Sequence, residues 1–136
     1  MPRNLGSGGK QGGFRRLRHR GKDLILVDLN SGRREDCERA LEAADELARE
    51  GSEAKARCLV DMTDACVDPD LTLRWKRAAP EHLLAMEKAA VLGADGLRQI
   101  ALSGYLMYAR LLGLAGVEKV RQFKDKQAAL AWLSED

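Results

Sequence analysis

Short apolar runs that alternate with helix-forming segments constrain the fold of this chain more than any other feature. Three runs, over residues 23–29, 57–62 and 88–93, have the length and composition of buried strands, and a fourth strand is expected over residues 118–123. Parallel neighbours need long crossover connections, which are usually helices. The alternation therefore predicts an α/β fold with a mostly parallel sheet covered by helices.

A further strand is expected at the start, because residues 14–20 alternate weakly and Gly21-Lys22 suits a tight hairpin turn before the first apolar run. Helices are expected from about residue 37 to Gly51, over 70–79 with a stop at Pro80 and a short helical piece at 81–86, over 96–112 after a cap at Asp95, and from Asp125 to Leu133. The predicted order is β-β-α-β-α-β-α-β-α, a mixed five-stranded sheet with an antiparallel edge strand.

The chain has the size and composition of one domain. Its 136 residues are 45% hydrophobic and 32% charged, enough to form a core without disulfides. Residues 1–13 are rich in Gly and Ser and are expected to be a disordered tail, which leaves residues 14–136 as the domain. No apolar run reaches 18 residues, so no membrane span is expected. Three cysteines without a CxxC pair predict reduced thiols and a cytoplasmic location.

The net charge of +2 conceals an uneven distribution. Residues 1–22 contain seven Lys and Arg and no acidic residue, whereas the rest of the chain contains 16 basic and 21 acidic residues. A basic segment can contact nucleic acid or anionic lipid. Residues 14–22 alternate as a strand does, however, and the acidic remainder would repel a polyanion. We therefore expect a charged, solvated edge strand and no nucleic-acid partner.

Several motifs occur along the chain in a recognisable order: RGKDL (20–24) with VDL (27–29), LVDMT (59–63), VLGADGL (91–97), and FKD (123–125) with AALAWL (128–133). Together they resemble the SpoIIAA-like (STAS-type) bacterial proteins over residues 14–134. The resemblance implies a STAS/CRAL-TRIO-like fold, in which a mixed sheet of about five strands is flanked by helices. The biochemical role of most members of this group is unknown.

One loop differs from better-understood relatives, the anti-sigma-factor antagonists. They carry an Asp-Ser-Ser-Gly-Leu motif in which a partner kinase phosphorylates a serine, whereas this chain reads Asp68-Pro69-Asp70-Leu71 at the similar place. Both serines are replaced, so the resemblance does not extend to the phosphorylation switch. Asp70 has two interpretations: a carboxylate that stands where phosphoserine charge would lie, or an ordinary helix cap.

Polar residues follow two predicted strands that are expected to be neighbours. Asp28 and Asn30 follow one strand, and Asp61, Thr63, Asp64, Asp68 and Asp70 follow the next. Ligands of open α/β sheets bind outside the carboxyl ends of the strands, so these groups could form a site for a polar ligand, a cation or a partner. The alternative is a set of turn and cap residues that bond backbone N–H groups. The candidate site residues here are Asp28, Asn30, Thr63, Asp64 and Asp70.

The segment 96–112 is more apolar than a helix beside a sheet requires. Leu97, Ile100, Ala101, Tyr108 and Leu111 form one face, and Leu102, Tyr105, Leu106, Met107 and Leu112 extend it around the helix. Three explanations are open: neighbouring loops cover the excess, a protein partner or a second copy binds it, or a small apolar or lipid-like ligand lies beside it. Tyr105, Leu106 and Tyr108 are the candidate contact residues.

No residue pattern predicts catalysis. The two histidines, His19 and His82, and the unpaired cysteines offer no usable set of metal ligands, and no nucleophile–base pair is apparent. We therefore expect neither an enzyme nor a bound cofactor. The predicted function is a non-catalytic STAS-like regulatory or protein-interaction domain, and the alternative is a carrier or sensor of a small apolar or lipid-like ligand.

Overall fold

A computed structural model describes residues 13–30, 33–50, 56–65, 68–114 and 116–135. Within these residues, five strands form one sheet in chain order: β1 (Gly13–His19), β2 (Lys22–Asp28), β3 (Ala56–Asp61), β4 (Met86–Leu92) and β5 (Val120–Phe123). β1 pairs with β2 antiparallel, and β2 to β5 are parallel. The predicted α/β class and the mixed, mostly parallel five-stranded sheet are confirmed. The expected tail lies almost entirely outside the described residues.

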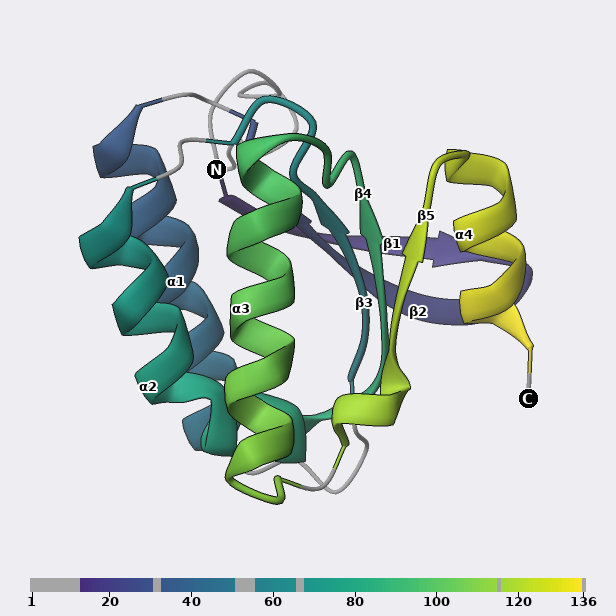
Figure 1. Cartoon of the computed structure of the whole chain (residues 1–136). Coiled ribbons are helices and arrows are strands. Elements are labelled where there is room, and N and C mark those ends of the chain that lie inside the picture. The colour runs from purple at the N-terminus through teal and green to yellow at the C-terminus, as the bar shows by residue number, and fades with distance from the viewer. Residues whose placement is uncertain (1–12, 31–32, 51–55, 66–67, 115, 136) are drawn as a thin grey trace.

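Helices cover both faces of the sheet unequally. α1 (Arg34–Glu50), α2 (Pro69–Ala85) and α3 (Leu97–Leu111) form a layer on one face, and α4 (Lys126–Ser134) lies on the other (Figure 1). The strand order explains this arrangement, because right-handed crossovers between successive parallel strands that always move in one direction put every connecting helix on the same side. Among the described residues, no helix is long and apolar enough to cross a membrane.

Strand alternation divides the core between these two faces. Leu24, Leu26 and Leu59 face α4 and pack with Leu130 and Leu133. The intervening residues face the three-helix layer and form a second cluster that includes Ile25, Val27, Cys58 and Ala89. The central strands therefore have continuous apolar sequences, because both of their faces are covered by helices.

The turn between β1 and β2 lies one residue earlier than predicted. Arg20 and Gly21 occupy it, with φ values of 51° and 77°. Positive φ at both central residues is the signature of a type I′ hairpin turn, which matches the twist of the strands that it joins. Lys22 already belongs to β2 and pairs with His19.

Pro80 does not end the second helix, so the predicted break at this residue is wrong. α2 is continuous from Pro69 to Ala85 with Pro80 inside it. Pro80 is exposed, whereas Ala79, His82 and Leu83 beside it are buried, so packing of the inner face offsets the lost backbone donor. The helix is capped by Asp68, whose Oδ1 accepts hydrogen bonds from the backbone N–H groups of Asp70 and Leu71. Asp70 is therefore not the cap.

The beginning of α3 also differs from the prediction. Gly96, with a φ of 56°, precedes Leu97, and no side chain caps the helix there. Asp95 contributes only its backbone carbonyl, which accepts from Arg98 and Gln99. The last strand is shorter than expected, because residues Val117–Lys119 form a 3₁₀ turn, η2, before β5. The predicted cap of the terminal helix at Asp125 is confirmed, with bonds from Gln127 and Ala128.

Candidate functional site

The polar residues after β2 and β3 lie at one edge of the sheet and are joined to one another. The backbone N–H of Asn30 donates to Asp28 Oδ1 at 3.0 Å, and the backbone N–H of Asp64 donates to Asn30 Oδ1 at 2.8 Å. Asp61 Oδ1 accepts from both the backbone N–H and the hydroxyl of Thr63. Asp28, Asn30, Thr63 and Asp64 are thus brought together as predicted, through bonds typical of turns.

Asp70 takes part in a charged group that ties α1 to α2. Arg34 donates to Asp70 at 2.6 Å and to Asp68 at 2.7 Å. The pKa of Arg34 is raised from its ordinary value, first by the hydrogen bond that Arg34 donates to Asp70 and then by the charge of Asp68. The Asp70 carboxylate is therefore engaged with a neighbouring helix.

This edge of the sheet has the geometry of structural turns. Among the residues that the structure describes, no group of three or more His, Cys, Asp or Glu side chains is arranged to hold a metal ion. The acidic groups whose bonds are given above accept them from nearby backbone N–H groups or from Arg34. These contacts hold the loops that connect the sheet to α1 and α2.

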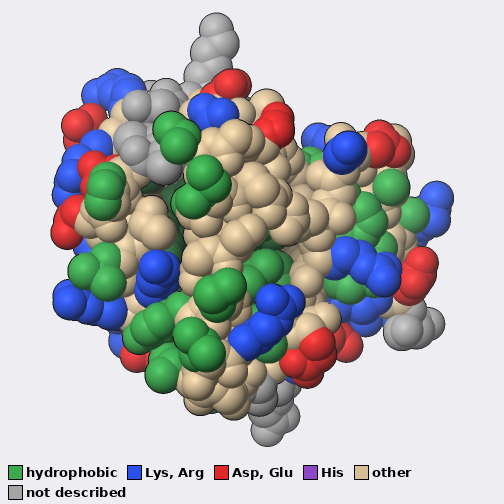
Figure 2. Space-filling view, in the orientation of Figure 1, with side chains coloured by type: hydrophobic (Ala, Val, Ile, Leu, Met, Phe, Trp, Pro, Cys, Tyr) green, Lys and Arg blue, Asp and Glu red, His purple; other side chains and the backbone are tan. Residues whose placement is uncertain are grey.

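α3 exposes a row of large apolar side chains. Leu97, Ile100, Met107 and Leu111 are each between 60 and 80% exposed, and Leu112 beyond the helix is 52% exposed. The residues that α3 buries lie on another face and are Leu102, Leu106 and Ala109. Figure 2 shows hydrophobic side chains over α3 and the adjoining part of α2, in an upper and a lower group. The first of the three explanations was that neighbouring loops cover the surplus apolar side chains of α3. The described residues do not cover them.

The three residues predicted on this helix have different surroundings. Leu106 is buried with Val91 and Leu102, so it belongs to the core. Tyr108 is half-buried. Tyr105 is half-buried and lines a pocket, and burial raises the pKa of its hydroxyl to about 12. The hydroxyl of Tyr105 therefore keeps its proton at neutral pH.

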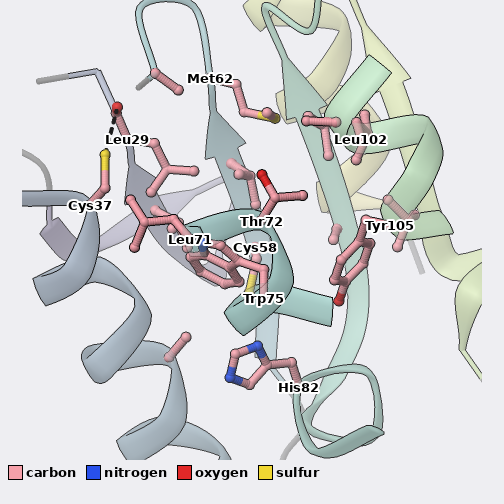
Figure 3. A pocket seen from close by; sticks show the side chains of 18 of the residues that line it. Leu29, Cys37, Cys58, Met62, Leu71, Thr72, Trp75, His82, Leu102 and Tyr105 are labelled. Atoms are coloured by element: carbon pink, nitrogen blue, oxygen red, sulfur yellow. Dashed lines mark hydrogen bonds between the residues drawn. The ribbon is translucent and has the colours of Figure 1, made fainter. Parts of the chain in front are cut away.

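The pocket lies between the sheet and the layer of α1, α2 and α3 (Figure 3). Its volume is about 180 Å³, and it is partly open to solvent. Apolar side chains from the sheet form its floor, and the helices form its walls. Residues that line it include Val27, Cys58 and Ala89 from the strands, Leu71, Trp75 and His82 from α2, and Ala101, Leu102 and Tyr105 from α3.

Few polar groups reach this pocket. Burial raises the pKa of the Cys58 thiol to about 12, so this sulfur is a protonated, unreactive thiol at neutral pH. The hydroxyl of Thr72 donates to the backbone carbonyl of Asp68. His82 is the exception: its Nε2 lies 2.7 Å from Asp45 Oδ1, and its buried Nδ1 has no hydrogen-bond partner.

The sequence prediction missed the pocket residues on α2. Leu71, Trp75 and His82 recur at helical spacing on one apolar face. That spacing could have revealed a buried histidine, but a helix divided at Pro80 separates His82 from the other two residues. The continuous helix brings all three to the same wall.

A comparison with protein families identifies the family of this chain. The model of the family described as SpoIIAA-like matches residues 25–134. The matched segment begins within β2 and ends at the last residue of α4, so it contains every described helix, the last four residues of β2, and β3, β4 and β5. No curated protein and no solved structure matches the chain.

Proposed function

Because the chain belongs to the SpoIIAA-like family, we propose that it is a non-catalytic protein-interaction domain of the STAS type whose contact surface is the exposed face of α3. We define the α3 stripe as Leu97, Ile100, Gly104, Met107 and Leu111. The binding partner that we propose for this stripe is a second copy of the chain. The exposure of the four large side chains is the observation that carries the proposal.

The spacing of the α3 stripe supports a helical partner. Its members follow one another at intervals of three, four, three and four residues. This is the spacing at which one side of a helix contacts another helix in a coiled-coil seam. A single apolar residue on a surface needs no explanation, whereas two groups of large apolar side chains on one face of a helix are a mark of an interaction site.

The stripe is also complementary to itself. Gly104 lies at its centre, so an antiparallel copy would oppose Leu97 to Leu111 and Ile100 to Met107. A two-fold axis through Gly104 would create such an isologous contact. Glycine has no Cβ and lets two backbones approach closely once the flexible Lys76 side chain, whose Nζ would lie 3.7 Å from a Cβ at Gly104, turns aside.

The helix dipoles favour the same antiparallel arrangement. The first turn of α3 contains Arg98 and no acidic residue, and Arg110 lies in its last turn, so side-chain charges do not select an orientation. Two antiparallel copies of α3 oppose the positive end of one dipole to the negative end of the other, which is favourable.

The size of the α3 stripe determines how stable a dimer we expect. A standard stable interface buries about 800 Å² per partner and involves roughly 20–30 residues a side. One face of α3, together with the neighbouring Leu84 and Leu112, offers fewer residues and less area than such an interface. The dimer should therefore be weak and depend on concentration.

Sedimentation velocity over a range of protein concentrations tests this proposal. The wild-type chain should shift towards a dimer as its concentration rises, and Met107→Glu should remain monomeric because it places a charge inside the seam. Ala128→Glu is the matched control, since it adds the same charge at an exposed position of α4, on the other side of the sheet.

A wild-type chain that stays monomeric at millimolar concentration would exclude self-association. A dimer that Met107→Glu leaves intact would mean that another surface makes the contact. Circular dichroism of each variant checks that the fold is retained, which is expected because Met107 is exposed.

A further inference from the structure

We propose that the pocket between the sheet and the three-helix layer binds a compact aromatic hydrocarbon, a molecule of one substituted ring or two fused rings without hydrogen-bonding groups. Burial of apolar surface and the fit of its shape would hold such a ligand. This site is distinct from the α3 stripe, because it lies on the inner side of the helix layer. The inference stands independently of the proposed self-association.

Small side chains keep the pocket open. Five of the residues that line it are alanines, and they come from all three helices, from β4 and from the loop after β3: Ala44, Ala65, Ala85, Ala89 and Ala101. Protein interiors are close-packed and have few voids larger than a water molecule. An unfilled space forfeits dispersion contacts along its lining. An apolar ligand that fills the pocket restores these contacts, so the alanines favour its binding.

The polar groups of the lining offer little to a polar ligand. The hydroxyl of Thr72 already donates to the backbone carbonyl four residues earlier, and the Nε2 of His82 contacts a carboxylate of α1. The thiol of Cys58 is buried and only a weak hydrogen-bonding group. A hydroxyl or a charge that entered the pocket would lose its hydrogen bonds to water without full replacement, which costs free energy. The lining therefore selects a ligand without such groups.

The volume of the pocket selects the size of the ligand. An engineered, apolar protein cavity of about 150 Å³ stays dry and binds benzene. The present pocket is of similar size, about 180 Å³, and it is partly open to solvent, so a ligand has a way in. One aromatic ring with a small substituent, or a fused pair of rings, therefore matches this space better than a long acyl chain does.

Aromatic side chains in two of the walls favour an aromatic ligand. Trp75 of α2 and Tyr105 of α3 both line the pocket (Figure 3). The ring of Trp75 already meets the ring of His82 edge to face, with their centroids 5.5 Å apart. Edge-to-face and offset contacts between rings are favourable beyond the area that they bury. A flat ring that enters the pocket gains such contacts, whereas an aliphatic molecule gains burial alone.

Titration of the full chain with toluene and with phenol, followed by NMR chemical shifts, tests the proposal. The two probes have nearly the same shape, but phenol carries a hydroxyl group where toluene carries a methyl group. We expect toluene to shift resonances of Leu102 and Tyr105. Phenol should bind at least about tenfold more weakly, because its hydroxyl leaves water without gaining a full set of partners. Toluene should also raise the Tm, since it binds the folded chain.

A variant that fills the pocket locates the bound probe. Ala101→Leu adds volume at a half-buried position of the lining, so toluene should bind at least about tenfold more weakly. The variant should keep the Tm of the wild-type chain or exceed it, because the added side chain supplies packing in an open space. Ala128→Leu is the matched control: it makes the same change at an exposed position of α4, on the other side of the sheet, and should leave the affinity for toluene unchanged.

Three results would overturn the inference. Toluene that shifts no pocket resonance up to its solubility limit would exclude an aromatic ligand of this size. Phenol that binds as tightly as toluene would show that the lining does supply a hydrogen-bond partner, which excludes a preference for hydrocarbons. Unchanged binding of toluene to Ala101→Leu would place the probe elsewhere. The first two results come from the wild-type chain, so they do not depend on how well the variant folds.

Discussion

Gly93 shows how a single residue shapes the polar edge of the sheet. It directly follows β4, with a φ of 76°, and packs against the backbone of Thr63 after β3. A Cβ at this position would lie 2.5 Å from Thr63 Cα and 2.6 Å from its backbone nitrogen. Side chains are excluded here both by the backbone conformation and by a neighbour that is itself backbone.

We therefore predict that Gly93→Ala destabilises the protein by about 3 kcal/mol or more, which combines positive-φ strain with a forced shift of the Thr63 loop. Gly96→Ala is the control, because Gly96 also has positive φ but a Cβ there would meet no atom within 4 Å. Its cost should be smaller than that of Gly93→Ala, because only the backbone strain remains. Urea unfolding of both variants measures the difference, and equal losses would show that the contact with Thr63 is unimportant.

At the scale of elements, α4 is held to the sheet by two cations that bond its last carbonyls. Arg57 of β3 donates to the backbone oxygens of Leu133 and Glu135 at 2.7 Å. Lys88 of β4 donates to Trp132 and Glu135. These carbonyls lie at the end of α4, where the backbone supplies few donors: Trp132 also accepts from the backbone N–H of Glu135. The two side chains therefore cap the helix and complement its dipole.

Arg57→Met should keep most of the apolar side-chain volume and remove these bonds. We expect a loss of about 2–3 kcal/mol, because charged hydrogen bonds to buried carbonyls disappear. Amide hydrogen exchange should become faster in α4 more than in α2 or α3. Lys124→Met, at an exposed position, is the control and should leave exchange unchanged. A uniform change in all helices would mean that Arg57 does not act on α4 in particular.

At the scale of the whole molecule, α3 separates two apolar surfaces. Its inner side contributes Leu102 and Tyr105 to the pocket, and its outer side carries the α3 stripe. The residues of the outer side are exposed, so a substitution there removes few contacts with the core.

Met107→Glu should accordingly change the free energy of unfolding by no more than about 0.5 kcal/mol, although it cannot form the dimer, because Met107 is exposed. Urea unfolding at a concentration below dimerisation measures this. A loss of about 2 kcal/mol or more would show that the outer side of α3 contributes to the core.

The arrangement of strands and helices could be predicted because its signals are local. Apolar runs of strand length at residues 23–29, 57–62 and 88–93 correspond to β2, β3 and β4, and the helix-forming segments between them supply the crossovers. The cap at Asp125 could be read in the same way, since it bonds residues two and three positions along the chain. Pro80 shows the limit of such rules, because long-range packing of Ala79 and Leu83 outweighs one lost donor.

The functional surfaces depended on tertiary structure. The sequence by itself determined that α3 carries apolar residues around most of its circumference, but it did not determine which side meets the sheet. The crossover direction and the packing against Val91 decided that Leu102 and Leu106 are buried and that Met107 and Leu111 face solvent. His82 likewise meets its partner Asp45 only in the folded chain, because the two residues are 37 positions apart in the sequence. Such contacts join segments that are far apart in the chain, so the periodicity within one segment does not predict them.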